Sequence, residues 1–600
     1  MEEIKKIPQR SEIAEADKWA TEDLYPSDDA WEAELATIQE QGKQLSDFAG
    51  KLNQPEMLLT YLTKMEEADV IISRLANYVM RKGDEDTRNP HYQALGGKFR
   101  GIMVALGAAC SFETPEIMAI EDEDMERFYA ECPGLERYRR YLTNMRRRKA
   151  HTLSAAEEKL LASAGEMSGA PSNIYGMFAN ADISFPDAVD AQGNRHPVRQ
   201  GTFVSLEESS DRVLRQSAYE SLYDSFAGFK NTAAGLLNAQ NKQLKFFAEA
   251  KKYPSAFEAA LDRTNVPTSV YLNLIEAVHQ NMDKMHRYVR LRKKMLGVDS
   301  LHFYDVYTPL LADVDKHIEF SEAKQTVYDA LAPLGEAYRA ILKEGFESRW
   351  IDVYTNEGKR SGAYSAGAAV HPYVLLNYTG TLDSMFTLAH EMGHALHSYL
   401  SNKHQNPVDA DYVIFVAEVA STCNEALLME YLLSKTTDKK ERAYLINHYL
   451  DQFKGTLYRQ TMFAEFELNI GRMVSEGKSL TAQLLCAEYK RLNELYYGPD
   501  MVVDDRIAME WARIPHFYYN YYVFQYATGY SAAIALSRRI LDEGESAVQD
   551  YLGFLSGGCS KSPIDLLKGA GVDMTSPEPV NQALELFGKL LDEMEALLEE

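Results

Sequence analysis

The stretch LAHEMGHALHSYL, residues 388–400, places two histidines four residues apart, with a glutamate directly after the first. Residues four apart in a helix lie about 40° apart around its axis, so His390 and His394 can direct their imidazoles at one point. Neutral imidazole suits zinc, and a catalytic zinc site keeps three protein ligands and an open position for water. Glu391 lies beside the pair, where it can take a proton from that water. The spacing predicts a metal-binding helix; the alternative is a polar helix face with solvated histidines.

The third ligand must come from another segment, because position 400, six residues after His394, is Leu and not a further histidine. Downstream, Glu418 interrupts the apolar run Val413–Ala420. A lone carboxylate buried in such a run would be costly unless a cation met it. Glu418 is therefore the predicted third metal ligand, and a structural ion pair is the alternative.

Glu425 lies seven residues after Glu418 and so falls on the same face of a helix. From there its carboxylate can accept a hydrogen bond from a ligand histidine and fix the orientation of that ring. His397, three residues after His394, is better explained as a surface or capping side chain than as a ligand. We therefore expect Glu425, and not His397, to support the metal site.

The formal net charge of the chain is −26, from 63 basic and 89 acidic residues. Such a field repels polyanions, so no nucleic-acid partner is expected. The N-terminal sequence MEEIKKIPQRSEIAEADKW lacks the apolar core of a secretory signal, which predicts a cytoplasmic protein.

Residues 514–537 contain no Lys, Arg, Asp or Glu and resemble a membrane span at first sight. They also carry His516, Asn520, Gln525 and six tyrosines, which a bilayer core would penalise. The stretch is therefore predicted as a helix buried in the protein or lining a cavity, and no membrane partner is expected.

Apolar residues recur at three- and four-residue spacing through most of the chain, as in amphipathic helices. Residues 1–180 carry only such helices and are predicted as a helical N-terminal or covering domain. Residues 181–600 are predicted as the catalytic domain. Within the latter, residues 181–198 alternate about Gly193 like a β-hairpin.

Strand signals return just before the metal motif. Residues 348–356 (SRWIDVYTN) and 371–380 (HPYVLLNYTG) flank the Gly-rich residues 358–369, which predicts a small sheet against the motif helix. We expect the strand at 371–380 to offer its edge to an extended peptide, whose main chain would add as a further strand.

The sequence HEMGH, followed after 24 residues by the glutamate of FVAEVAST, resembles the thimet oligopeptidase family of zinc metallopeptidases, most closely its oligoendopeptidase F branch. The segments WATEDLYPSDDAWEAEL, GKRSGAY, YVLLNYTGTLDSMFTLAHE and HFYYNYYVFQYATG look like that branch as well, so the likeness spans most of the chain. The resemblance implies that His390, His394 and Glu418 bind one Zn²⁺ per chain and that Glu391 is the general base.

Hydrolysis of an amide creates an oxyanion, which hydrogen-bond donors usually help to stabilise. RIPHFYYNYYVFQYATGY offers His516 and three tyrosines, Tyr519, Tyr522 and Tyr526, spaced as on one face of a helix. Tyrosines at this spacing can also be core residues with their hydroxyls satisfied at the edge. The family resemblance implies that a histidine and tyrosines of a late helix hold the substrate, which makes His516, Tyr519 and Tyr522 the candidates.

Together these features predict a mainly α fold, with a zincin-like catalytic core and a small β-sheet enclosed by a helical shell around a deep substrate channel. The predicted function is a zinc-dependent endopeptidase that hydrolyses internal bonds of short unstructured oligopeptides through a zinc-bound water activated by Glu391. One alternative is a non-catalytic peptide-binding scaffold. Another is a zinc exopeptidase that trims single residues.

Overall fold

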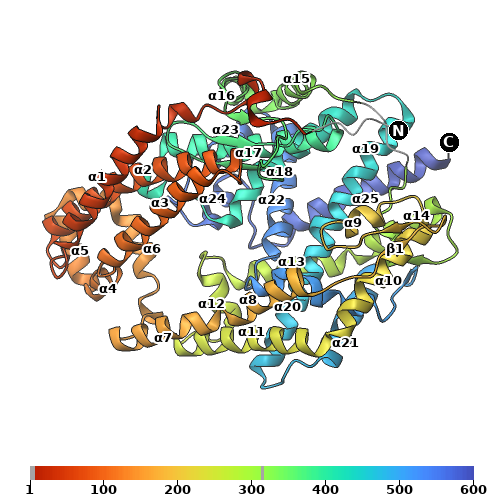
Figure 1. Cartoon of the computed structure of the whole chain (residues 1–600), viewed down its shortest axis with the longest axis horizontal. Coiled ribbons are helices and arrows are strands. Elements are labelled where there is room, and N and C mark those ends of the chain that lie inside the picture. Colours follow the sequence, from red (N-terminus) through yellow and green to blue (C-terminus); the bar gives the residue numbers. More distant parts are fainter. Residues whose placement is uncertain (1–6, 312–316, 600) are drawn as a thin grey trace. The chain divides into compact units, whose positions relative to one another are not determined.

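The computed structural model describes residues 7–311 and 317–599, and most of these residues are helical (Figure 1). The strands are two or three residues long and, within the described residues, pair into three small sheets. Helices prevail because the apolar side chains recur with helical spacing, so each helix has a face to bury. The predicted mainly α fold with a small β-sheet is confirmed.

The chain divides into two compact units, each built from three separate stretches. The first unit consists of Met1–Ala150, Lys316–Tyr431 and Leu536–Val572; the second consists of His151–Asp315, Leu432–Ala535 and Asp573–Glu600. The boundary predicted after residue 180 follows the order of the sequence, which does not show where the chain returns to an earlier unit. The metal-motif helix thus belongs to the same unit as the N-terminal helices.

The N-terminal helices share one core with the small sheet beside the metal motif. Three helices surround it: α1 (Asp28–Ser46), α2 (Pro55–Glu85) and α3 (Pro90–Ala109). Trp31 and Leu75 are fully buried in this core, together with Tyr373 and Leu375 of the sheet. Burial of each such large apolar side chain contributes about 1.5–3 kcal/mol. The N-terminal region therefore supports the sheet of the first unit.

The sheet consists of β4 (Ile351–Asp352), β6 (Tyr373–Leu375) and β5 (Tyr364–Ala366), in that spatial order. The central strand is β6, which pairs parallel with β4 and antiparallel with β5; Val374 lies opposite both Ile351 and Ser365. The expectation that residues 371–380 offer a free edge is therefore wrong. The Gly-rich residues 358–369, expected to link two strands, supply β5 and cover that edge.

The outer edges of this sheet belong to β4 and β5. Main chain from the N-terminal segment covers β4, because the Val353 N–H donates to the Asp17 carbonyl at 3.0 Å and the Ala20 N–H donates to the Arg349 carbonyl at 2.9 Å. Within the described residues, no strand pairs with the outer side of β5. Among the described strands, β5 therefore presents the unpaired outer edge of this sheet.

In the second unit, β1 (Ala188–Val189) and β2 (Arg195–His196) form the hairpin predicted about Gly193. Gly193 has a φ of 84°, a left-handed conformation that glycine adopts without a steric penalty. The hairpin prediction is confirmed, and α9 (Phe203–Glu207) and α10 (Arg212–Gly228) follow it.

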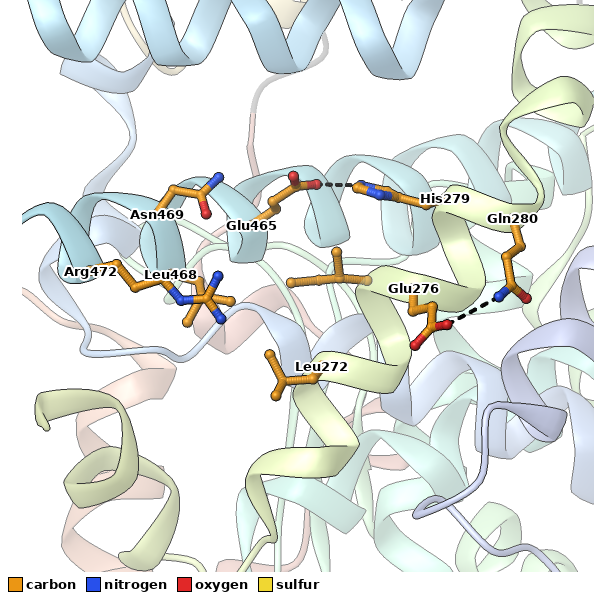
Figure 2. Close-up of a pocket in the computed structure, with 9 residues that line it drawn as sticks. Leu272, Glu276, His279, Gln280, Glu465, Leu468, Asn469 and Arg472 are labelled. Carbon is orange, nitrogen blue, oxygen red and sulfur yellow. Dashed lines mark hydrogen bonds and ion pairs between the residues drawn. The ribbon is translucent and has the colours of Figure 1, made fainter. Parts of the chain in front are cut away.

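Also in the second unit, side chains of α13 (Thr268–Gln280) and α20 (Arg459–Ser475) line a groove of about 500 Å³ (Figure 2). Glu465 of α20 pairs with the His279 Nε2 of α13 at 2.6 Å, drawn as a dashed line in Figure 2, and accepts a hydrogen bond from the Tyr496 hydroxyl at 2.9 Å. These bonds hold α20 against α13 and against Tyr496. The same helix also contacts the tyrosine-rich segment described below.

One stretch of the described chain, Pro90–Ala119, has the length and composition of a membrane span, and 17% of its most apolar window is buried. It comprises α3 and α4 (Glu113–Ala119). Among its exposed side chains is Val104, which is 74% exposed. Residues 514–537 do not have the length and composition of a membrane span.

Candidate active site

Two helices of the first unit, α17 (Leu382–His404) and α18 (Ile414–Lys435), bring the three predicted metal ligands together. One ligand atom each from His390, His394 and Glu418 lies within 4.8 Å of the other two. The Glu418 Oε2 is 3.4 Å from the His390 Nε2 and 3.6 Å from the His394 Nε2. Within the described residues this is the only group of His, Cys, Asp and Glu with such geometry. Its donor set, two imidazoles and one carboxylate, suits a zinc ion with a fourth position left for water or substrate.

Glu425 lies next to the other nitrogen of the first ligand. Its Oε1 is 2.5 Å from the His390 Nδ1, while the Nε2 of the same ring faces Glu418. An Nδ1–H that donates to Glu425 leaves the Nε2 with its lone pair for a metal. The structure therefore places Glu425 where the seven-residue spacing from Glu418 predicts it.

The close approach of α17 and α18 depends on a glycine between the two histidines. A Cβ at Gly393 would lie 2.6 Å from the Cα of Ser421 and 2.8 Å from the carbonyl oxygen of Ala420, so no larger residue fits there. One turn earlier along α17, the side-chain amide of Asn424 donates to the Ala389 carbonyl at 3.1 Å. Gly393 is not among the residues predicted for the site, although a glycine inside the motif is a signal for close backbone contact.

Glu391 is 6% exposed, and its Oε2 is buried without a hydrogen-bond partner. Burial raises the pKa of this carboxyl; His390 and His394 oppose the shift, and Glu418 adds to it. A buried acceptor without a partner costs about 1–3 kcal/mol. That oxygen is thus available to a water or a substrate group beside the metal ligands.

The electric field of the cluster favours a positive charge. Burial lowers the pKa of His390, but hydrogen bonds to Glu418 and Glu425 outweigh it and hold that pKa well above its usual value. Burial raises the pKa of Glu418, and hydrogen bonds with His390 and His394 bring it far below its usual value. Carboxylates that stabilise a proton on the imidazole also stabilise a divalent cation in the same place.

His397 was expected to be a surface or capping side chain, and this expectation is wrong. The residue is 1% exposed. Its ring stacks on Tyr412 with centroids 3.7 Å apart and also contacts Phe554. Burial, with a smaller effect from His394, lowers the pKa of His397 to about 3. It is a neutral core residue of the first unit.

A cavity of about 680 Å³ lies beside the outer strand of the sheet. Its walls include Ser365 of β5, the following residues 367–369, and Ser398 and Asn402 of α17. Ser398 comes one helical turn after His394. The first unit therefore has open space next to both the strand edge and the helix that carries the two histidines.

In the second unit, the three late candidates form one ring cluster together with Tyr526. The His516 ring centroid lies 5.3 Å from that of Tyr519, 6.4 Å from Tyr522 and 6.1 Å from Tyr526. The Tyr522 ring lies 6.2 Å from Tyr519 and 5.4 Å from Tyr526. Burial lowers the pKa of His516, which favours a neutral imidazole able to donate one hydrogen bond.

The expectation that these side chains share one helix is wrong. His516 lies in a 3₁₀ turn, Pro515–Tyr518, and α22 (Phe524–Glu543) begins only after the candidates Tyr519 and Tyr522. Between them, Asn520 and Tyr521 have φ values of 59° and 56°, which a right-handed helix excludes. The chain bends at this point, and the bend, not helical spacing, gathers the rings.

The helical fold and the histidine–glutamate cluster define a metallopeptidase. The chain belongs to peptidase family M3, whose family model matches residues 205–586. A second family model, described as oligopeptidase F, matches residues 116–185, so the chain is a metallo-oligoendopeptidase of that branch.

Curated relatives and a solved structure agree with this assignment. The oligopeptidase PepF of Bacillus subtilis is 46% identical over 594 residues, which cover 99% of this chain and 89% of the relative. An oligoendopeptidase F homolog of Lactococcus lactis is 40% identical, with 98% of each chain covered. The crystal structure of oligoendopeptidase-F from Enterococcus faecium is 37% identical and has a TM-score of 0.75, with 95% of this chain and 99% of that chain covered.

Proposed function

We propose that this protein is a zinc-dependent endopeptidase that cleaves internal bonds of short, unstructured oligopeptides, with Glu391 as its general base. The observation that carries the proposal is the buried, unpartnered Oε2 of Glu391 beside the converging His390, His394 and Glu418. A buried carboxylate oxygen without a partner is destabilising, and a non-catalytic peptide-binding scaffold would not require one at this position. The cytoplasmic location stays a prediction from the sequence.

Zn²⁺ held by the two histidines and Glu418 would supply Lewis-acid chemistry, polarising the scissile carbonyl and lowering the pKa of the attacking water. The Oε2 of Glu391 takes one proton from that water as the oxygen bonds to the carbonyl carbon. As the carbon–nitrogen bond breaks, Glu391 gives the same proton to the leaving nitrogen. Its raised pKa suits both roles, because a stronger acid would hold the proton too weakly in the first step.

The main chain of the substrate is proposed to add to the outer edge of β5. Main-chain hydrogen bonds along this edge would carry affinity, and side-chain pockets would add only modest preferences, which suits an enzyme for varied oligopeptides. The cavity beside Ser365 gives room for substrate side chains on this side of the strand.

The proposed function is tested with a series of quenched-fluorescence peptides and one stably folded protein. We expect cleavage at internal bonds of peptides of roughly five to twenty residues, since each strand residue spans only about 3.3 Å and several free residues are needed to reach along a strand edge. Cleavage of the folded protein should be negligible, because it would first have to unfold locally. Release of single terminal residues only would favour the exopeptidase, and an absence of any cleavage would favour the binding scaffold.

We propose that His516 and Tyr522 donate hydrogen bonds to the oxyanion that forms during the reaction. His516→Ala and Tyr522→Phe should each lower kcat by roughly ten- to a thousandfold, with smaller changes in KM, because these bonds are strongest in the transition state. A matched control is Tyr518→Phe, since the Tyr518 ring stacks on Tyr175 at 4.3 Å and is buried. If the first two variants lose only thermal stability, the cluster is a packing feature.

A further inference from the structure

Two consecutive residues other than glycine adopt left-handed backbone conformations between the candidate tyrosines. Asn520 tolerates such a conformation better than most residues, but Tyr521 does not, so the conformation of Tyr521 is strained. Such a pair persists only where surrounding groups impose it. The contacts of Tyr521 therefore determine the path of the chain between Tyr519 and Tyr522.

The main-chain contact comes from a buried acid on α20. The N–H of Tyr521 donates to the Glu467 Oε1 at 2.8 Å, and Glu467 is 5% exposed. Burial raises the pKa of this carboxyl to about 8, although the bond from Tyr521 opposes the shift. At neutral pH the group is thus mainly an uncharged acid whose carbonyl oxygen receives the amide.

The side-chain contact comes from the next turn of the same helix. Gly471 lies four residues after Glu467, and a Cβ at this position would overlap the hydroxyl oxygen of Tyr521. The Tyr521 ring also packs on Phe257 and Tyr271, with centroids 5.3 and 6.1 Å away. One face of α20 therefore fixes both the amide and the ring of Tyr521.

The candidate tyrosines lie directly on either side of this clamped turn. Tyr519 precedes the two left-handed residues and Tyr522 follows them, and the bend between them brings the two ring centroids to 6.2 Å from each other. A change in φ at Tyr521 would rotate the two rings apart. The orientation of both hydroxyls thus depends on α20, which does not itself carry any of the candidate donors.

We propose that Glu467 and Gly471 are positioning residues for catalysis, which hold the Asn520–Tyr521 turn so that the side chains of Tyr519 and Tyr522 face the substrate. The inference rests on the proposed function, because Glu467 and Gly471 would position side chains that the proposed function places at the substrate. Glu467 makes no contact with the reacting atoms in this role and acts through Tyr521 alone.

The test compares kcat and KM of three variants on one cleavable peptide. Glu467→Leu removes the acceptor, and Gly471→Ala displaces the Tyr521 ring; each should lower kcat about tenfold or more with KM changed less than about threefold. Glu467→Gln keeps a carbonyl oxygen in place of the neutral acid and should retain kcat within about threefold. Zinc content should equal that of the wild type in all three.

Glu465→Gln is the matched control, because this acid lies two residues away on α20 and pairs with His279 (Figure 2). It also accepts a hydrogen bond from the Tyr496 hydroxyl. The substitution should lower thermal stability and leave kcat unchanged. Wild-type kcat in folded Glu467→Leu or Gly471→Ala, or equal losses in Glu465→Gln, would overturn the inference. If Glu467→Leu does not fold, Gly471→Ala decides. Unchanged kcat in His516→Ala and Tyr522→Phe would instead refute the proposed role of the ring cluster.

Discussion

Glu391→Gln is expected to reduce kcat on a cleavable peptide by at least about a hundredfold while the metal stays bound. The amide keeps the size of the side chain but cannot take the proton of the attacking water or return it to the leaving nitrogen. Steady-state kinetics and metal analysis of the same preparation measure both quantities.

Two further measurements separate this result from a folding defect or a metal defect. Because burial raises the pKa of Glu391, folding stability falls as the pH rises above the ordinary pKa of a carboxyl group, so a neutral Gln should leave the melting temperature of the metal-free protein unchanged or higher at pH 7. Glu425→Gln should instead weaken metal binding by about 10–100-fold and regain activity in excess zinc. Near-normal turnover by Glu391→Gln would mean that another group accepts the proton.

The second large effect concerns the metal itself. The purified protein should hold about one zinc ion per chain, and His390→Ala or Glu418→Ala should lose most of it, because two ligands rarely retain zinc against water. His404→Ala is the control, since His404 lies near the end of the same helix and its Nδ1 pairs with the Leu400 carbonyl at 2.8 Å. Full occupancy in either ligand variant would show that the assignment of ligands is incorrect.

The geometry of the metal cluster could be predicted because it is local to two helices. Helical spacing alone places His390 beside His394 and Glu425 beside Glu418, and a carboxylate within an apolar run signals the need for a cation. The pairing of the two helices was not predictable in this way. It depends on the absence of a side chain at Gly393, which brings the backbone of α18 against α17.

Features imposed by distant residues were missed. The edge strand β5 is three residues long and lies in a Gly-rich stretch, so it carries no periodic signal. The local sequence likewise does not predict the irregular backbone before α22, because the conformation of Tyr521 is imposed by Glu467 and Gly471, about fifty residues earlier in the chain. In both cases tertiary contacts override local pattern.

The first unit consists of three stretches that are far apart in the sequence, so the ribosome synthesises its parts at different times. The motif helix depends on residues near the end of that unit: Phe554 packs on His397, and the Gln405 side chain donates to the Ser556 carbonyl at 2.7 Å. These residues follow Glu418 by about 140 positions, which a ribosome takes roughly 7–28 s to add at 5–20 residues per second. An unfinished chain therefore carries all three metal ligands without the packing that fixes their helix. We expect peptidase activity to arise only after Phe554 and Ser556 have left the ribosome and packed against the motif helix.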